Sequence, residues 1–254
     1  MKKTMSKQRY IINAISVFVV ILIAWIAITE LGLVKPVILP KPIDVAKYIY
    51  EAFRYNNLIT DVGISVSRIL LGFLLSAVVG VPLGMLAGTS KTFDSLLRPI
   101  CEFMRYIPVP TLVPLVMVWV GIGENAKIAV LFLGCVFQLL LMVADDAAAV
   151  SDDLINAGAT LGATRLQQLT KILLPAVMPR IMENLRMTIG WAWTYLTLAE
   201  LFATESGLGY RILKAQRFMQ TDAIFGLILT IGALGLITDR LFILFNRKVF
   251  HWAE

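Results

Sequence analysis

The charged residues of this chain are spaced so unevenly that the gaps between them constrain the fold more than any other feature. Six long runs contain no Asp, Glu, Lys or Arg: residues 10–29, 69–90, 106–123, 128–144, 187–199 and 223–238. A helix crosses a hydrocarbon core of about 30 Å with about 20 apolar residues, at about 1.5 Å per residue. The first four runs approach or reach that length, and the last two reach it with their apolar flanks. The pattern predicts an all-α polytopic membrane protein with six transmembrane helices.

The overall composition agrees with a membrane protein. Apolar residues make up 58% of the chain and charged residues only 16%, whereas soluble domains are about half apolar and a quarter charged. A disordered chain, a collagen-like chain and a disulfide scaffold are excluded on the same grounds. The two cysteines, Cys101 and Cys135, lie within apolar stretches, so we expect them to be packing residues.

The positive charges predict the orientation of the chain. An even number of spans places both termini on one side, and lysine and arginine favour the cytoplasmic side. The segment before the first span contains three lysines and Arg9, so we expect residues 1–9 and 246–254 to be cytoplasmic. The alternative of a cleaved signal peptide is disfavoured, because the apolar run of residues 11–28 is longer than the usual core of such a peptide and no small-x-small cleavage site follows it.

The segment of residues 42–55 has the pattern of an amphipathic helix. It opens with Pro42, and its apolar residues recur at helical spacing while charged residues occupy the other face; the apolar positions are Val45, Tyr48, Ile49, Ala52 and Phe53. Such a helix is typical of the membrane interface, here the periplasmic one. Packing of this face on neighbouring spans is an equally open interpretation.

Glycines and prolines predict two features of the second and third spans. Gly80, Gly84 and Gly88 share one helix face, which favours close packing against another helix. Pro108 and the two prolines that follow it, at positions 110 and 114, should bend or break the third span near its cytoplasmic end. Freed backbone carbonyls are tolerated in a membrane only where protein or water satisfies them, so a cavity is expected nearby.

The segment of residues 151–174 is predicted to be a structured cytoplasmic loop. Ser151 and the two aspartates after it form a helix start, and Gly162 is placed to end that helix with a positive φ. Thr164 and Gln167 have the spacing of a capping box that starts a second helix. A loop with its own helices is usually functional, although a simple tether between the fourth and fifth spans is the alternative.

This loop resembles the EAA loop of the permease subunits of bacterial ABC importers, the binding-protein-dependent transport inner-membrane components. The family pattern is Glu-Ala-Ala, three residues, Gly, nine residues, Ile, one residue, Leu-Pro. The matching positions here, with every spacing kept, are Asn156, Ala157, Gly158, Gly162, Ile172, Leu174 and Pro175. Asn replaces the usual Glu and Gly the second Ala, so any salt bridge from the first position is in doubt.

Four further segments are similar to the nitrate, sulfonate, taurine and bicarbonate branch of that family. They are Leu39 to Pro42, Val79 to Gly88, Pro108 to Glu124 and Ala199 to Tyr210. The resemblance implies that residues 1–254 form a single transmembrane domain with the type I importer permease (MetI-like) fold. It also implies a multi-pass protein of the bacterial cytoplasmic (inner) membrane, in contact with membrane lipid, with a second copy completing the pore.

The resemblance further implies two kinds of protein partner. In the family, the loop is a coupling helix that sits in a groove on a cytoplasmic ATPase, two such ATP-binding subunits are present, and a periplasmic or lipid-anchored solute-binding protein delivers the cargo. This chain contains no G-x-x-x-x-G-K-[ST] motif. We therefore expect no cofactor here, with ATP and Mg on the partner subunits.

Charged residues in or beside the spans are candidates for the translocation pathway, because each is costly to bury. Arg105 follows Glu102 by three residues, and Arg186 follows Glu183 by three, so each can form an ion pair within its helix. One hypothesis is that Arg105 or Arg186 faces the pore and attracts an anion. Snorkelling of these side chains to the interface, or neutralised pairs, is the alternative for each.

The fifth span carries a polar and aromatic stripe. Trp193, Thr197 and Glu200 share a face by helical spacing, with Thr194 beside it. We expect a hydroxyl-lined path there, although anchoring of the rings at the interface is an alternative. Glu200 and the turn that contains Gly207, Gly209 and Tyr210 are expected near the outer mouth, as a periplasmic gate or a contact for the binding protein.

The sequence provides no catalytic constellation and no metal site. The one histidine, His251, lies in the terminal tail, and no basic face outside the lipid favours nucleic acid. The predicted function is a non-enzymatic permease subunit of an ATP-driven, binding-protein-dependent importer for a small anionic solute. The alternatives are a stand-alone secondary transporter or channel, which would favour inverted repeats or more spans, and an intramembrane enzyme, which would need paired catalytic groups at one depth.

Overall fold

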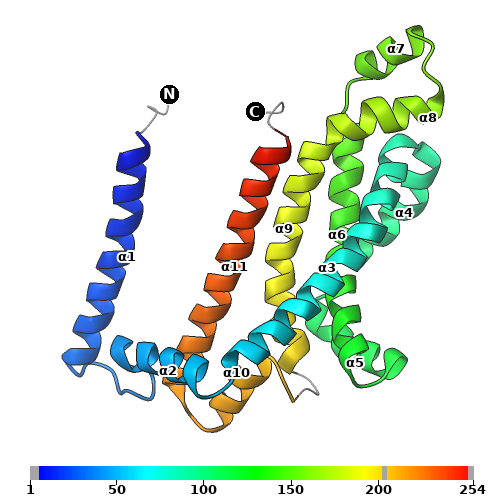
Figure 1. Cartoon of the computed structure of the whole chain (residues 1–254). Helices are drawn as coiled ribbons and strands as arrows, with labels where there is room; N and C mark the ends of the chain where they lie inside the picture. Colours follow the sequence, from blue (N-terminus) through cyan, green and yellow to red (C-terminus); the bar gives the residue numbers. More distant parts are fainter. Residues whose placement is uncertain (1–5, 202–204, 251–254) are drawn as a thin grey trace. The chain divides into compact units, whose positions relative to one another are not determined.

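The computed structural model describes residues 6–201 and 205–250, and within these ranges the chain is helical apart from short connections (Figure 1). The expectations for the extreme termini, including His251, fall outside the described residues. The helices in chain order are α1 (Lys7–Glu30), α2 (Pro42–Arg54), α3 (Leu58–Thr89), α4 (Lys91–Met104), α5 (Val109–Val120), α6 (Glu124–Ala148), α7 (Asp152–Thr160), α8 (Arg165–Gln167), a π-helical segment (Gln168–Leu173), α9 (Leu174–Leu201), α10 (Leu208–Arg217) and α11 (Thr221–Val249).

Four helices are long and apolar enough to cross a membrane by themselves. They are Ile12–Glu30 of α1, α3, α6 and α11, and the pair α4 and α5 would add a fifth span if it is counted as one broken span. α9 has 28 residues, but its charged and hydroxylated side chains leave it outside this group. The polytopic all-helical class is therefore confirmed, while the count of six spans stays a prediction.

The third predicted span is the clearest departure from the sequence expectation. The charge-free run of residues 106–123 is not one helix, because α5 covers only 12 residues and α4 meets it at an angle of 104°. A helix of that length rises about 18 Å, well short of the hydrocarbon core. The expectation of one spanning helix here is wrong, and the expected break is confirmed: Pro108 is the N-cap of α5 and Pro110 lies in its first turn.

One of two compact units contains the chain up to Ile59 together with Arg211–Thr230. In it, the indole N–H of Trp25 donates to the carbonyl of Pro40 at 2.9 Å, and the Trp25 and Phe225 rings lie 5.7 Å apart. Helix α2 buries Val45 and Ala52 on one face, which confirms the predicted amphipathic helix. Only 6% of the apolar stretch of α1 is buried, as suits a helix surrounded by lipid.

The second unit contains residues from Thr60 to Tyr210 and from Ile231 onward, and α6 and α9 are its centre. Figure 1 shows these two helices side by side. Along their contact lies a buried apolar cluster made of Leu139, Val143, Ala147, Leu173, Val177 and Ile181. Because Leu173 belongs to the π-helical segment, this core extends from α6 and α9 into the base of the loop of residues 151–174.

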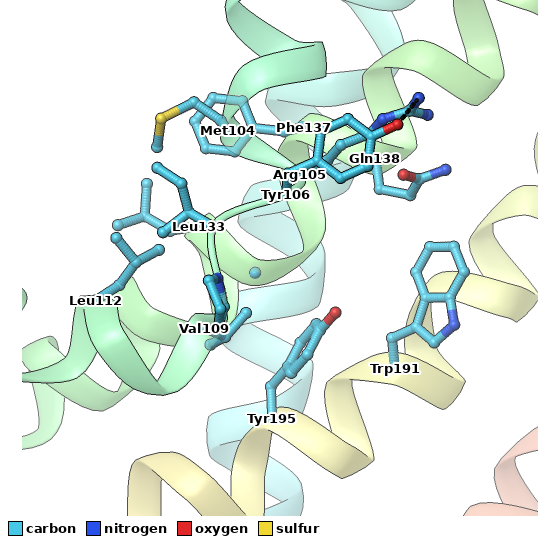
Figure 2. A pocket seen from close by; sticks show the side chains of 13 residues that line it. Met104, Arg105, Tyr106, Val109, Leu112, Leu133, Phe137, Gln138, Trp191 and Tyr195 are labelled. Carbon is cyan, nitrogen blue, oxygen red and sulfur yellow. Dashed lines mark hydrogen bonds between the residues drawn. The ribbon is translucent and has the colours of Figure 1, made fainter.

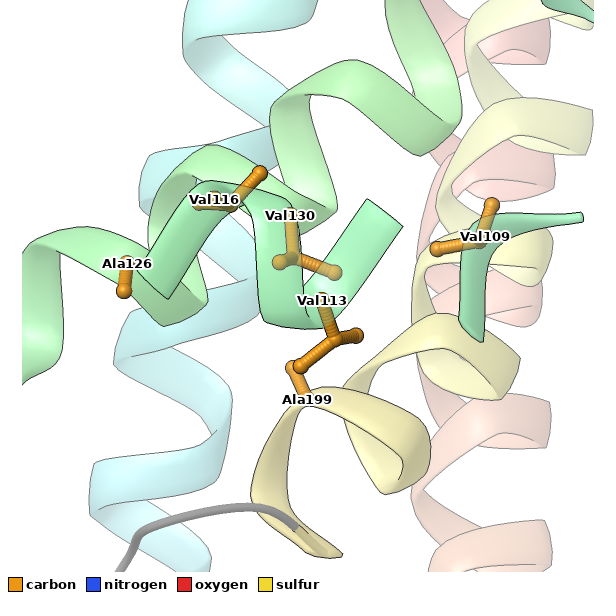
Figure 3. Packing of buried hydrophobic residues seen from close by; sticks show 6 residues of the cluster. All are labelled: Val109, Val113, Val116, Ala126, Val130 and Ala199. Carbon is orange, nitrogen blue, oxygen red and sulfur yellow. The ribbon is translucent and has the colours of Figure 1, made fainter. Parts of the chain in front are cut away.

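The short helix α5 is held by a second apolar cluster. Figure 3 shows valines of α5 packed against α6 and α9, and the members of this cluster are Val109, Val113, Val116, Ala126, Val130 and Ala199. All six are buried, with Val113, Val116 and Val130 only 1% exposed. A helix too short to span the bilayer is thus stabilised by close packing on two long neighbours.

The glycine face of α3 packs against α6 as expected. A Cβ atom on Gly88 would lie 2.5 Å from the Ala144 carbonyl oxygen and 2.6 Å from the Ala147 Cβ, and one on Gly84 would lie 2.7 Å from the Leu140 oxygen. These distances are far below van der Waals contact, and the obstacles are mostly backbone atoms that cannot move aside. The predicted role of this stripe in helix packing is confirmed.

We predict that Gly88→Ala weakens the packing of α3 on α6. The added methyl must separate the two backbones, and overpacking of this kind costs about 1–3 kcal/mol. Unfolding of the purified protein in detergent, followed by far-UV circular dichroism, should begin at a lower temperature. The matched control is Gly63→Ala on the same helix, where no atom lies within 4 Å of the added Cβ; an equal loss of stability in both variants would contradict the assignment.

Candidate functional site

The loop of residues 151–174 folds as a helix, a glycine joint and a second helix. Helix α7 follows the N-cap Ser151, and Gly162 has φ of +80°, which an L-residue with a side chain rarely adopts. Thr164 accepts from the backbone N–H of Gln167 while the Gln167 side chain accepts from the N–H of Thr164, so the predicted capping box is formed. The elbow shape expected from the sequence is confirmed, and we call residues 151–174 the elbow.

A π-helical segment, Gln168–Leu173, connects the second arm of the elbow to α9. The sequence analysis did not anticipate it, and no residue type in the segment signals it. A π turn holds one more residue than an α turn and is often found at functional sites. Leu173 is buried in the α6 and α9 core, with Leu169 and Ile155 packed on the same cluster, so the elbow is attached to the spans as a packed element.

The motif residues of the elbow lie close together. The side chain of Ile172 packs directly against the backbone of Gly158, where a Cβ would overlap it. Gly158, Gly162 and Ile172 also line an open hollow of about 430 Å³. Asn156 and Ala157 are exposed on α7, while Leu174 and Pro175 begin α9.

The far side of the elbow presents apolar side chains to its surroundings. Leu161 is 89% exposed, Leu166 70% and Leu154 44%. Leucines this exposed at the tip of a structured loop are unusual unless another surface covers them. The elbow therefore has the features of a contact surface for a partner.

The expected cavity lies at the proline break. It has a volume of about 450 Å³ and is bounded by the α4–α5 connection, by α6 and by α9 (Figure 2). Gly134 of α6 makes room for the Tyr195 ring, because a Cβ there would lie 2.7 Å from a ring carbon. The prediction of a cavity near the broken span is confirmed.

Arg105 is the charged side chain of this cavity. Its guanidinium donates to the Tyr106 hydroxyl at 3.2 Å and lies 5.0 Å from the centre of that ring. Among the salt bridges between described residues none includes Arg105 or Glu102, so the pair expected from their spacing is not formed. The positive charge of Arg105 is left without a carboxylate beside it.

Arg186 has a different environment. It pairs with Glu183 at 2.9 Å, as its spacing predicted, and more closely with Asp239 of α11 at 2.6 Å. The second contact was not foreseen, because nothing in the sequence brings α9 and α11 together. Two carboxylates already neutralise Arg186, and it does not line the cavity at the proline break.

The polar stripe predicted on α9 is split by the fold. Trp193 is 5% exposed and its indole N–H donates to the Thr238 hydroxyl of α11 at 3.0 Å. Thr194 is exposed and Thr197 half-buried, whereas Glu200 is completely buried. Within this chain, a solute could reach the threonines but not the carboxylate of Glu200.

Glu200 belongs to a buried ionic cluster that the sequence analysis did not identify. Arg68 of α3 is 1% exposed and donates to Glu200 and to Glu124 of α6, each at 2.6 Å. Lys127 adds a bridge to Glu124 at 2.8 Å, and the Ser65 hydroxyl donates to Glu200 at 2.7 Å. The available signal was Arg68 itself, a charge at the edge of a long apolar run, whose partners only the fold reveals.

The glycine turn before α10 is bound to this cluster. The backbone N–H of Gly209 donates to Glu200 at 2.8 Å, that of Leu208 to Ser65 at 3.0 Å, and that of Gly207 to Asp61 at 2.7 Å. Gly207 has φ of +103°, and a side chain on it would overlap Glu200 and Arg68. Glu200 and this turn do lie together, as expected, and Tyr210 is half-buried just beyond.

An all-helical chain with long apolar helices, a broken span beside a cavity and a structured loop on one end defines the class of membrane-embedded transport components. The sequence matches the family described as "Binding-protein-dependent transport system inner membrane component" over residues 80–251, more than half of the chain. The chain belongs to this family, and it is therefore a multi-pass membrane protein.

Two curated relatives show the branch of the family. The putative aliphatic sulfonates transport permease protein SsuC of Bacillus subtilis is 34% identical over 92% of this chain and 84% of its own length. The taurine transport system permease protein TauC of Escherichia coli is 29% identical over 96% of this chain and 91% of its own length. The branch suggested by the sequence segments is confirmed.

Solved structures confirm the MetI-like fold. One chain of the MetNI methionine ABC transporter, in an inward-facing conformation, matches with a TM-score of 0.68 and 21% identity, over 76% of this chain and 95% of that chain. At this identity the likeness concerns the fold alone.

We predict that Arg68→Met strongly destabilises the protein. The substitution leaves the Glu200 carboxylate buried without its cation, and breaking a buried pair in this way costs about 3–5 kcal/mol. Unfolding in detergent should show this loss. The matched control is Arg98→Gln. The salt bridges of Arg98 to Asp94 and Asp145 are partly exposed and contribute about 1 kcal/mol or less. Equal losses of stability in the two variants would contradict the larger contribution that we assign to Arg68.

Proposed function

We propose that this chain is the pore-forming permease subunit of an ATP-driven importer for a small anion of the sulfonate or taurine type. The proposal is supported by family membership and by the sulfonate and taurine permeases among its relatives. Nitrate and bicarbonate are related anions within the same proposal, since a bicarbonate transport permease of Synechococcus elongatus is 30% identical over 69% of this chain.

The single observation that carries the coupling role is the construction of the elbow. It has exposed leucines at its tip and a buried leucine at its base, so a force on the tip reaches the α6 and α9 core through packed side chains. We propose that two cytoplasmic ATP-binding subunits, which hold ATP and Mg, contact the elbows of two permease copies. The exposed position of Asn156 favours a hydrogen bond to that partner in place of an ion pair.

We propose that the elbow and the chain termini are cytoplasmic, as the lysines and Arg9 before the first span favour. The turn with Gly207, Gly209 and Tyr210 would then face the periplasm. There it would act as the outer gate or as a contact for a periplasmic or lipid-anchored solute-binding protein. The ionic cluster of Arg68 supports this role, because it fixes the turn by backbone hydrogen bonds.

The proposed translocation pathway passes the cavity at the proline break. Arg105 supplies the positive charge of the cavity. Thr194, which is exposed, and Thr197, which is half-buried, lie on α9 outside the lining of this cavity and are proposed as further polar side chains of the pathway. The weaker candidates for the pathway are Arg186, Trp193 and Glu200, because their polar groups are already paired within the chain.

A stand-alone transporter or channel is the competing function. It would move solute without any partner, whereas the proposed importer requires the ATPase and the binding protein. Uptake into lipid vesicles separates the two: flux by this chain alone would reject the proposal, and uptake that depends on internal ATP and added binding protein would support it.

We predict that Gly162→Val uncouples the elbow. A β-branched residue at φ of +80° costs about 1–2 kcal/mol, so the two arms should lose their fixed angle. We expect ATP-dependent uptake in vesicles to fall at least tenfold. The matched control is Gly32→Val outside the elbow, where φ is +66° and no atom lies within 4 Å of the added Cβ. Full uptake by Gly162→Val would contradict the coupling role.

A further inference from the structure

The cavity at the proline break has two chemically different ends. Figure 2 shows Arg105, Gln138 and Trp191 on one side of the space and Met104, Leu112 and Leu133 on the other. A cavity of about 450 Å³ is within the range of about 300–1,000 Å³ typical of small-molecule sites. A site that is polar at one end and apolar at the other suits a ligand with the same division.

Several polar groups that line this cavity have no partner in residues 6–201 and 205–250. Among the described residues, no hydrogen bond is formed by the Gln138 amide, by the indole N–H of Trp191 or by the Tyr195 hydroxyl. Arg105 donates only to the Tyr106 hydroxyl and has no carboxylate partner. Polar groups within a membrane normally have a partner, so these donors are available to a ligand that enters the cavity.

The charge of the site favours an anion with a single charged group. One guanidinium and several neutral donors lie together, and no acid lines the cavity. The apolar end adds a second requirement, because a small inorganic anion would leave the surface of Met104, Leu112 and Leu133 uncovered. Burial of alkyl groups against such a surface is favourable by about 0.8 kcal/mol for each CH₂.

We propose that this cavity is a binding site for organic anions, with the sulfonate or carboxylate group at Arg105 and Gln138 and the hydrocarbon part against Met104, Leu112 and Leu133. The inference rests on the proposed transport function and narrows its substrate class. Inorganic anions such as nitrate and bicarbonate are excluded as well-fitting ligands. Arg105 determines the charge of the ligand, and Gly134 determines the space, because it allows the Tyr195 ring to lie against α6.

Intrinsic fluorescence of Trp191 offers a direct test. The permease is purified with its ATPase subunits in lipid nanodiscs, without binding protein, and is titrated with sodium butanesulfonate, methanesulfonate or nitrate. We expect butanesulfonate to cause a saturable change in fluorescence, and this change should disappear in Trp191→Phe. Methanesulfonate should bind with an affinity more than tenfold lower, because three CH₂ groups are missing. Nitrate should cause no saturable change.

Variants test the two ends separately. Arg105→Gln should lower the affinity for butanesulfonate at least tenfold, since hydrogen bonds to charged groups are among the stronger ones, and Arg105→Lys should recover part of it. Gly134→Ala, which pushes on the Tyr195 ring, should weaken butanesulfonate more than methanesulfonate. The charge-matched control is Arg180→Gln, on a side chain 61% exposed outside the cavity, which should leave the affinity unchanged.

Three outcomes would overturn the inference: no saturable binding of butanesulfonate by the wild type, equal affinity for nitrate, or equal affinity in Arg105→Gln. ATPase activity of the same nanodiscs, measured with and without the binding protein, keeps this result separate from the proposed function. If the binding protein stimulates the ATPase activity but no anion binds in the cavity, the proposed importer function is kept and only the proposed binding site is rejected.

Discussion

The absence of water in the hydrocarbon core is the constraint on which this structure depends. Every polar group within the spans must find a partner in the protein, and the fold shows the consequences. The buried Arg68 pairs with the fully buried Glu200 and with Glu124, whose side chain is 56% exposed. Arg186 is neutralised by two further carboxylates, and α5 of the broken span packs on α6 and α9. The cavity beside Pro108 holds donors that have no partner among the described residues, and it is where we propose that a solute binds.

Packing, and not hydrophobicity, holds the helices together under this constraint. Lipid is as apolar as a leucine side chain, so helices associate through close contact of small residues and through polar pairs. The glycine face of α3 on α6 supplies the first kind of contact. The cluster around Arg68 supplies the second kind, and it also binds the glycine turn before α10. Both kinds of contact lie in the unit that also contains the elbow.

Sequence reasoning was accurate where local chemistry decides the structure. The amphipathic helix, the glycine joint, the capping box and the break at Pro108 each depend on residues within a few positions of one another. Sequence reasoning failed where the length of a charge-free run was taken as the length of a helix. The run of residues 106–123 is long enough to suggest a span, but its helix α5 has only 12 residues and meets α4 at 104°. The candidate pathway stays a prediction, because helical spacing places Trp193, Thr197 and Glu200 on one stripe without stating what covers each side chain.

By itself, the sequence determined that the chain is helical, crosses the membrane several times and carries a structured loop of the importer type, because apolar runs, prolines and caps act over short distances. Only the tertiary structure decided which charged side chains form ion pairs within the protein and which do not. Glu200 and Arg186 are paired by residues 132 and 53 positions away, and Arg105 is not paired at all with an acid in the described chain. Partners so distant are set by helix packing, which no local pattern encodes.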